Sequence, residues 1–318
     1  MKVYNGLEEV YHIKNPILTL GTFDGVHLGH QKIIQNIVEK AKEINGETVL
    51  FTFDPHPRTV LFPEFHNLKL IQTQEEKLAK LKRCGIEHVI VYPFSKDFSR
   101  TPATEFVRDY LVSKINVHTI VIGYDHQFGK NREGSLEHLM ELSTVYAFDV
   151  IEIPAQEVDE VNVSSTKIRN ALEKGDVYAA NTFLGEPFQL NGIVVKGQGI
   201  GKSIGFPTAN LAVQNSLKMI PKNGVYAIRV CVNNVVLFGM MNIGIRPTVS
   251  EDAQQTIEIH IFDFNDDLYN QSLMVEVIQF LREEHRFNSV DELITQLKKD
   301  EIVARTLLES VSSKLYAL

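Results

Sequence analysis

The residues best suited to chemistry lie together in one short stretch, residues 21–30, which reads G-T-F-D-G-V-H-L-G-H. Its glycines let the backbone come close to a phosphate group, and the free N–H groups of a helix start favour anions. His27 and His30 are three residues apart and share one face of a helix start, where they can donate hydrogen bonds to phosphate oxygens as charge develops. We expect a phosphate site. The alternative is an ordinary turn with two solvent-exposed histidines, and a zinc site is disfavoured because no further ligand is near in sequence.

Three further motifs of the first half carry polar groups. His56 stands in a rigid D-P-H-P turn at 54–57, although a lone histidine there can equally be an exposed loop residue. The segment G-Y-D-H-Q-F-G occupies 123–129. In V-S-S-T-K-I-R at 163–169, Ser and Thr are good N-caps, and Arg169 lies one turn into the helix, where a guanidinium can fork onto phosphate. A capped helix without a ligand is the alternative for this last motif.

The second half contains a glycine-rich loop followed by G-F-P-T-A-N at 205–210. G-K-S at 201–203 fails as a phosphate-binding P-loop, because the position that requires the first glycine of that motif holds Lys196. Four glycines at 197–205 still make a loop that can approach phosphate. Downstream, isoleucines alternate with Glu258 and His260 on a half-buried strand, where Glu258 can simply face solvent.

The composition of the 318-residue chain is that of a soluble globular protein with two domains. Its net charge of −8 argues against a broad nucleic-acid surface. Cys84 and Cys231 form neither a disulfide framework nor a metal pattern, which favours reduced thiols and a cytoplasmic location. We see neither a signal peptide nor an apolar run long enough for a membrane helix.

The elements that must position the first set of motifs alternate between strand and helix. This rhythm predicts a doubly wound parallel sheet, whose ligands lie outside the carboxyl ends of the strands. The expected strands are 17–20, 48–53, 88–92, 119–122 and 145–153, and the expected helices are 28–44, 74–83, 103–115 and 135–142.

The pattern changes after a short helix at 176–183 and the punctuation L-G-E-P at 184–187. We therefore expect two domains, 1–184 and 185–318. Short alternating strands predict an antiparallel β-barrel, closed by an amphipathic helix at 290–314. The expected strands are 188–196, 225–232, 235–243, 256–264 and 273–281.

Five segments, in order, make the chain resemble the prokaryotic bifunctional FAD synthetases, which join an FMN adenylyltransferase to a riboflavin kinase. Residues 21–30 are similar to the adenylyl-transfer signature, and 164–169 to the S-S-T-x-I-R motif of the same superfamily. Residues 205–210 resemble the riboflavin kinase signature, and 258–264 its E-x-H-x-x-D-F segment. The segment 123–129 is similar to the family's G-x-D-F-x-F-G, with His126 in place of the usual aromatic residue, and Asn270 replaces a usual glycine.

The resemblance implies that the N-terminal domain makes FAD from FMN and ATP, and that the C-terminal barrel makes FMN from riboflavin and ATP. Flavins are then substrates and products rather than prosthetic groups, Mg²⁺ is required, and nucleic acid and membrane are not partners; weak self-association of the chain stays open. It implies catalytic roles for His27, His30, Arg169 and Glu258 and magnesium binding by Thr208 and Asn210. The ATP-binding residues that it implies are Gly21, Phe23, Asp24, Gly29, Asp125, Ser164, Thr166, Gly199, Gly201, Thr208 and Asn210.

No cysteine nucleophile and no Ser-His-Asp arrangement lies in these motifs, so we expect direct in-line attack with the protein positioning the reactants. Two alternatives remain open at this point. One is a kinase whose first domain adenylylates another acceptor, and the other is a flavin-sensing protein without chemistry.

Overall fold

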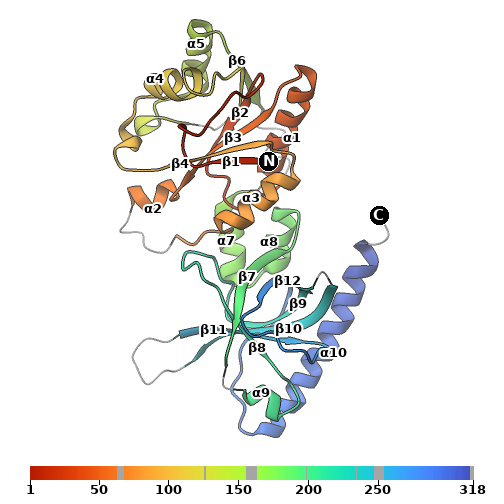
Figure 1. The fold of residues 1–318 in the computed structure, drawn as a ribbon. Coiled ribbons are helices and arrows are strands. Elements are labelled where there is room, and N and C mark those ends of the chain that lie inside the picture. The colour runs from red at the N-terminus through yellow and green to blue at the C-terminus, as the bar shows by residue number, and fades with distance from the viewer. Residues whose placement is uncertain are drawn as a thin grey trace. The chain divides into compact units, whose positions relative to one another are not determined.

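The computed structural model describes residues 1–62, 68–124, 127–154, 163–197, 199–233, 235–246 and 254–315. The chain divides into two compact units, Met1–Ser165 and Thr166–Leu318 (Figure 1). The first is built on a parallel sheet and the second on a closed antiparallel barrel, as the sequence predicted.

Six parallel strands form the sheet of unit 1, in the order β1-β4-β3-β2-β5-β6. The strand order reverses at β2, which has β3 on one side and β5 on the other. Ligands of such sheets bind outside the carboxyl ends of the strands at this reversal. The bounds are β1 Lys2–Tyr4, β2 Ile17–Leu20, β3 Thr48–Asp54, β4 His88–Pro93, β5 Thr119–Gly123 and β6 Asp149–Ile153.

Helices cover both faces of this sheet. Neighbouring residues of a strand point to opposite faces, so consecutive apolar residues make both faces apolar. Phe51 packs with Phe106 and Leu139, whereas its neighbour Leu50 packs with Ile34 and Leu81. The helices on the first side are α4 (Ala103–Glu105), its continuation η2 (Phe106–Val112) and α5 (Leu136–Tyr146); those on the second are α1 (Leu28–Glu43) and α3 (Gln74–Arg83). Short segments complete the unit: α2 (Pro57–Leu61), η1 (Phe98–Arg100) and η3 (Lys130–Arg132).

Two predicted elements differ in the structure. The helix expected at 103–115 begins as α4 but continues as the wider π-helix η2. The strand expected from residue 145 begins at Asp149, because Val145 and Tyr146 still belong to α5 and Ala147 ends that helix in the left-handed conformation, with φ of 58°.

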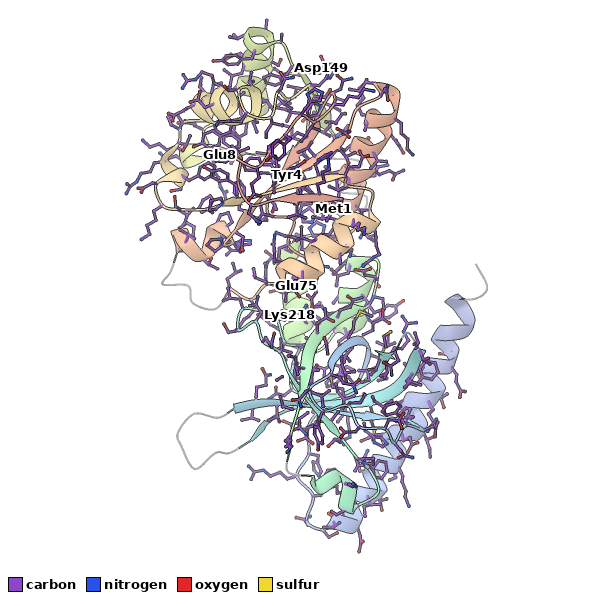
Figure 2. The ribbon with its side chains drawn as sticks, viewed as in Figure 1. Met1, Tyr4, Glu8, Glu75, Asp149 and Lys218 are labelled. Atoms are coloured by element: carbon purple, nitrogen blue, oxygen red, sulfur yellow. The ribbon has the colours of Figure 1, made fainter. Side chains whose placement is uncertain are left out.

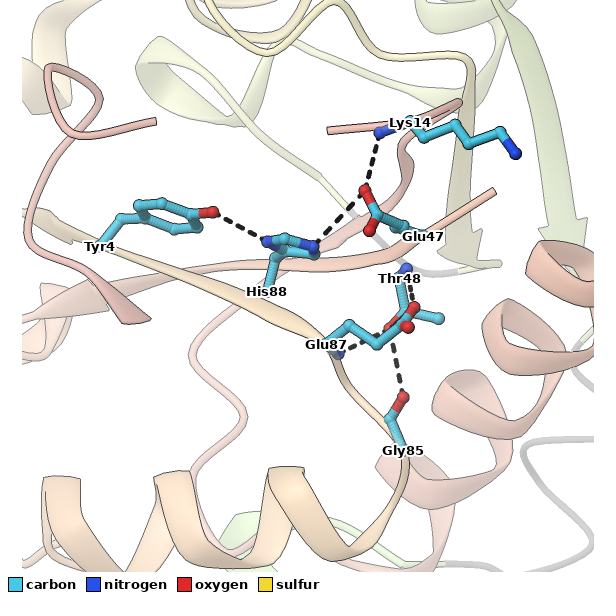
Figure 3. Close-up of polar contacts among 7 residues, drawn as sticks. All are labelled: Tyr4, Lys14, Glu47, Thr48, Gly85, Glu87 and His88. Atoms are coloured by element: carbon cyan, nitrogen blue, oxygen red, sulfur yellow. Dashed lines mark hydrogen bonds and ion pairs between the residues drawn. The ribbon is translucent and has the colours of Figure 1, made fainter. Parts of the chain in front are cut away.

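A polar network holds the edge strand β1 near the amino ends of the strands (Figure 3; Tyr4 is also labelled in Figure 2). The Tyr4 hydroxyl lies 2.9 Å from Nδ1 of His88, and Nε2 of His88 lies 3.7 Å from Glu47. Beside it, the backbone N–H of Thr48 donates to Glu87 over 2.9 Å. The network lies at the strand ends opposite to the carboxyl ends where a ligand is expected.

Unit 2 is a closed antiparallel barrel in the order β10-β11-β8-β7-β12-β9. Its strands are β7 Phe188–Val195, β8 Ala209–Ala212, β9 Gly224–Val232, β10 Val235–Arg246, β11 Gln254–Ile261 and β12 Ser272–Arg282. Helices α7 (Ser165–Lys174) and α8 (Val177–Leu184) precede the barrel, α9 (Ile200–Ser203) follows β7, and α10 (Val290–Leu315) ends the chain.

The terminal helix α10 packs along the outer face of β9 and β10 (Figure 1). Ala304 and Leu308 join a buried cluster with Met240. At the edge of this contact, Nη2 of Arg282 lies 2.7 Å from the carboxylate of Asp300, which is only 5% exposed. This partly buried ion pair ties the helix to the strand that carries Arg282.

Candidate functional site

The phosphate turn predicted at 21–30 joins β2 to α1 at the reversal point of the sheet. Phe23 and Val26 adopt positive φ values of 48° and 39°, although neither is glycine. Such conformations cost about 1–3 kcal/mol each and persist where the surroundings impose them. Both side chains are buried, with 3% and 0% exposure, so packing holds the turn in this shape.

His27 and His30 stack on each other at the start of α1. Their ring centroids are 3.6 Å apart with an angle of 15° between the planes, and Phe23 lies against His30 at 4.6 Å. His27 caps the helix, because its Nδ1 accepts the backbone N–H of His30 over 3.3 Å. His27 is only 8% exposed, so the alternative of two solvent-exposed histidines is wrong.

Burial keeps both imidazoles neutral near pH 7. Desolvation, and next the charge of Lys80, lower the pKa of His27 to about 4. Desolvation and the neighbouring His27 hold the pKa of His30 well below 6.5. A neutral imidazole has one N–H to donate and one nitrogen to accept. Nδ1 of His30 is buried and has no hydrogen-bond partner within the described ranges.

Asp24 points into the protein from this turn. Its carboxylate is 4% exposed and accepts the backbone N–H groups of Ile71 at 3.0 Å and Gln72 at 3.3 Å. It therefore ties the turn to the segment that leads into α3. Gly29 is packed against His27, since a Cβ at this position would lie 3.3 Å from the imidazole Nδ1.

The S-S-T motif approaches the same turn through Ser165, whose hydroxyl donates to the Asp24 carbonyl over 2.9 Å. Ser164, just before it, is half-buried in unit 1, whereas Thr166 is exposed and Arg169 half-buried on the first turns of α7 in unit 2. Asp125 and His126 lie outside the described residues. His56 caps α2 by accepting the backbone N–H of Arg58 over 3.1 Å.

Two residues that sequence reasoning missed lie beneath the turn: Lys77 and Lys80 of α3. They are 7% and 3% exposed, and their ammonium groups reach the backbone of the turn. Lysine is normally a surface residue, so two lysines three positions apart on a helix are expected to lie on its solvent-exposed face. One signal was available, because both residues fall on the same helix face as the buried Leu81.

In unit 2, the glycine-rich loop folds closely onto the start of β8. Gly199 has a φ of 73° and precedes α9. A Cβ on Gly201 would overlap the Phe206 carbonyl oxygen, and one on Gly197 would overlap the Asn210 amide. Glycine at positions 197 and 201 therefore lets the loop lie directly against the P-T-A-N segment.

Three oxygen-bearing side chains converge beside this loop. Thr208 Oγ1 donates to Glu258 Oε2 over 3.5 Å, a long hydrogen bond. Glu258 on β11 is the direct cross-strand partner of Asn210 on β8, so both side chains lie on one face. His260 supports them, since its Nδ1 donates to the Pro207 carbonyl over 2.8 Å.

These donors suit magnesium in kind, because Mg²⁺ prefers oxygen ligands and takes few of them from the protein when phosphates supply the rest. In the described part of the chain, no group of three or more His, Cys, Asp or Glu side chains gathers as a metal site. A magnesium ion here would therefore depend on Thr208, Asn210 and substrate phosphates.

Comparisons with known proteins find matches to both halves of the chain. The sequence model of the FAD synthetase family matches residues 11–167, and that of the riboflavin kinase family matches residues 184–308. A bifunctional riboflavin kinase/FMN adenylyltransferase of Listeria monocytogenes is 38% identical over 90% of each chain. The enzyme of that description from Escherichia coli K12 is 35% identical over 96% of this chain and 97% of its own.

A solved structure described as a macrolide-efflux protein from Streptococcus pneumoniae is also similar. It is 33% identical, covers 96% of this chain and 98% of its own, and superposes with a TM-score of 0.88. Across the described residues of the present chain, no helix has the length and apolar character to cross a membrane.

Proposed function

Since the chain belongs to the family of bifunctional riboflavin kinase/FMN adenylyltransferases, we propose that it carries out two successive ATP-dependent transfers. The barrel phosphorylates riboflavin to FMN, and the parallel-sheet domain joins FMN to the adenylyl group of ATP to give FAD and pyrophosphate. We assign these activities to residues 185–318 and 1–184. The proposal rests chiefly on one observation, that relatives with both activities in their names match at least 90% of the chain.

In the adenylyl transfer, an FMN phosphate oxygen attacks the α-phosphorus of ATP, and the bond to the pyrophosphate oxygen breaks. The stacked histidines support this assignment, because neutral imidazoles can donate hydrogen bonds to the phosphate oxygens as charge moves onto them. Ser164, Thr166 and Arg169 bind the triphosphate, with the Arg169 guanidinium forking onto its oxygens. Gly21, Phe23, Asp24, Gly29 and Asp125 complete the ATP-binding set, and the contact of Asp24 with Ile71 gives it a positioning part in that set.

In the kinase reaction, Glu258 removes the proton from the ribityl 5′-hydroxyl as that oxygen attacks the γ-phosphorus of ATP; the bond from this phosphorus to the β–γ bridging oxygen breaks, and ADP leaves with that oxygen. This role is supported by the contact of Glu258 with Thr208 and by its cross-strand pairing with Asn210. Gly199 and Gly201 shape the loop over the ATP phosphates, and Thr208 and Asn210 hold Mg²⁺. The ion, when bound, neutralises phosphate charge.

Cys84 and Cys231 are half-buried thiols, which suits the cytoplasmic location that we propose.

The test incubates the purified protein with riboflavin, ATP and Mg²⁺ and separates the flavins by chromatography over time. We expect FMN to appear first and FAD to follow. FMN alone would refute the assignment of the N-terminal domain. Bound but unchanged riboflavin would refute both activities and identify a flavin sensor.

A further inference from the structure

We propose that Lys80, together with Lys77, is a positioning residue for the adenylyl transfer: the two ammonium groups hold the phosphate turn from the side of α3 and set the charge environment of His27 and His30. This inference rests on the proposed function of unit 1. Neither lysine belongs to a motif that carries the family resemblance, and both lie on α3, outside the turn itself.

Side chains of α3 donate hydrogen bonds to the turn, and a side chain of the turn accepts hydrogen bonds from the backbone just before α3. From α3, Lys77 Nζ donates to the Thr22 carbonyl at 3.4 Å and to Thr52 Oγ1 at 3.2 Å, and Lys80 Nζ donates to the Gly25 carbonyl at 3.4 Å. From the turn, the Asp24 carboxylate accepts backbone N–H groups just before α3.

The first turn of α3 is held by its own hydrogen bonds, which fixes the backbone positions from which the two lysine side chains extend. Thr73 and Glu76 form a capping box in which each side chain accepts the other residue's backbone N–H, at 3.2 and 2.9 Å. Lys77 follows Glu76 directly, and Lys80 lies one turn further on the same face.

Burial argues that these lysines act on the turn rather than on substrate. A buried ammonium is costly unless polar or charged groups compensate it. Burial lowers the pKa of Lys77 to about 8, and Asp24 and Asp54 partly offset this effect, while carbonyl oxygens of the turn accept hydrogen bonds from both ammonium groups. The N–H and C=O of a trans peptide point in opposite directions. The Thr22 carbonyl faces Lys77, so the N–H of Phe23 points away from α3.

The same cations act on the stacked imidazoles. Among the described charged groups of unit 1, Lys80 acts on both imidazoles and Lys77 acts on that of His30, while Asp24 and Asp54 act on Lys77. After burial, the charge of Lys80 is the main cause that lowers the pKa of His27, and both lysines lower the pKa of His30. Removing the charge of Lys80 must therefore raise both histidine pKa values and bring imidazolium formation closer to neutral pH.

The test compares Lys80→Met, which removes the charge, with Lys80→Arg, which retains it. For each full-length variant, kcat and KM for ATP in FAD formation from FMN are measured between pH 3.5 and 8, a range that includes the His27 pKa of about 4. Riboflavin phosphorylation is followed in the same preparations as an internal control. The titration of the histidine Cε1–H signals by NMR gives a readout independent of activity.

We expect Lys80→Met to shift the histidine titration, and the acid limb of FAD formation, upward by about one pH unit, as for other close like charges. We also expect FAD formation to fall about 10-fold or more with FMN formation unchanged, and Lys80→Arg to restore the wild-type acid limb. An unchanged histidine titration in Lys80→Met would overturn the inference, whatever its activity. Absence of FAD formation in the wild type would instead refute the proposed function. If Lys80→Met does not fold, Lys80→Gln, which keeps a donor for the Gly25 carbonyl, replaces it.

Discussion

Replacement of Asp24 by alanine tests how the phosphate turn is held. The carboxylate is 4% exposed and accepts two backbone N–H groups, at 3.0 Å from Ile71 and 3.3 Å from Gln72. It also stabilises the charge of the buried Lys77. In Asp24→Ala, these N–H groups lose their charged acceptor and the ammonium loses a negative neighbour, while the rest of the unit keeps its packing.

The expected loss follows from these contacts. Hydrogen bonds to a charged group contribute roughly 1.5–3 kcal/mol each. Removal of one partner from a buried charge pair costs about 3–5 kcal/mol. The two contributions overlap, so we expect the free energy of unfolding of unit 1 to fall by about 3–5 kcal/mol. For a domain of this size, that loss lowers Tm by roughly 6–20 °C. Asp24→Asn retains one acceptor oxygen and should lose about half as much.

Calorimetry of the full chain, combined with hydrogen exchange of the amides at 71 and 72, measures this loss within unit 1. The matched control is Asp97→Ala, because Asp97 is an exposed carboxylate of the same unit, and we expect it to change nothing measurable. FAD formation should fall in Asp24→Ala while FMN formation persists. A loss below about 1 kcal/mol, with unchanged exchange at residues 71 and 72, would refute the structural role given to this carboxylate.

Three further predictions concern both units. Thr208→Val removes one hydroxyl beside Glu258, so it should reduce riboflavin phosphorylation about 10–100-fold and spare FAD formation from added FMN. Steady-state assays of both reactions test this, and an unchanged kinase activity would contradict it. Asp300→Ala should cost about 3–5 kcal/mol in denaturant unfolding of unit 2, because Arg282 then stays partly buried without its carboxylate; a change within error would show that the pair does not fix α10. The pKa of His27 is about 4 in the folded protein and about 6.5 when unfolded, so the unfolded state takes up the proton first as pH falls. The contribution of neutral His27 to the free energy of unfolding is complete above pH 6.5 and declines by up to about 3 kcal/mol toward pH 4. The variant His27→Gln should therefore flatten the acid side of a plot of stability against pH. An equal slope in the wild type and the variant would argue against this account.

Sequence periodicity located most of the fold, because the central strands are runs of apolar residues and the helices carry clear apolar stripes. It missed β1, which has only three residues and pairs with a strand more than 80 positions away. It also missed β8, because the P-T-A-N residues read as a loop, although their pairing with β11 gives Asn210 its place beside Glu258. The pattern assigns Val145 to a strand, whereas it lies in α5, because an apolar residue near a helix end fits either element.

The candidate sites were predictable in composition but not in geometry. The types and spacing of His27 and His30 indicated a shared helix face, and the structure confirms it. Their burial could not be foreseen, because it depends on Phe23 and on α3, which lies more than 40 residues further along the chain. The burial of Lys77 and Lys80 could not be foreseen either, because only tertiary contacts bring their helix against the turn.

The measurement that tests the two-site account most directly compares His30→Ala and Glu258→Gln, each assayed for FMN formation from riboflavin and for FAD formation from added FMN. We expect His30→Ala to lose FAD formation by about 10²–10³-fold or more, with FMN formation intact. Glu258→Gln should lose FMN formation and retain FAD formation. If either variant, folded as judged by circular dichroism, lost both activities to the same extent, the assignment of two separate active sites would be wrong.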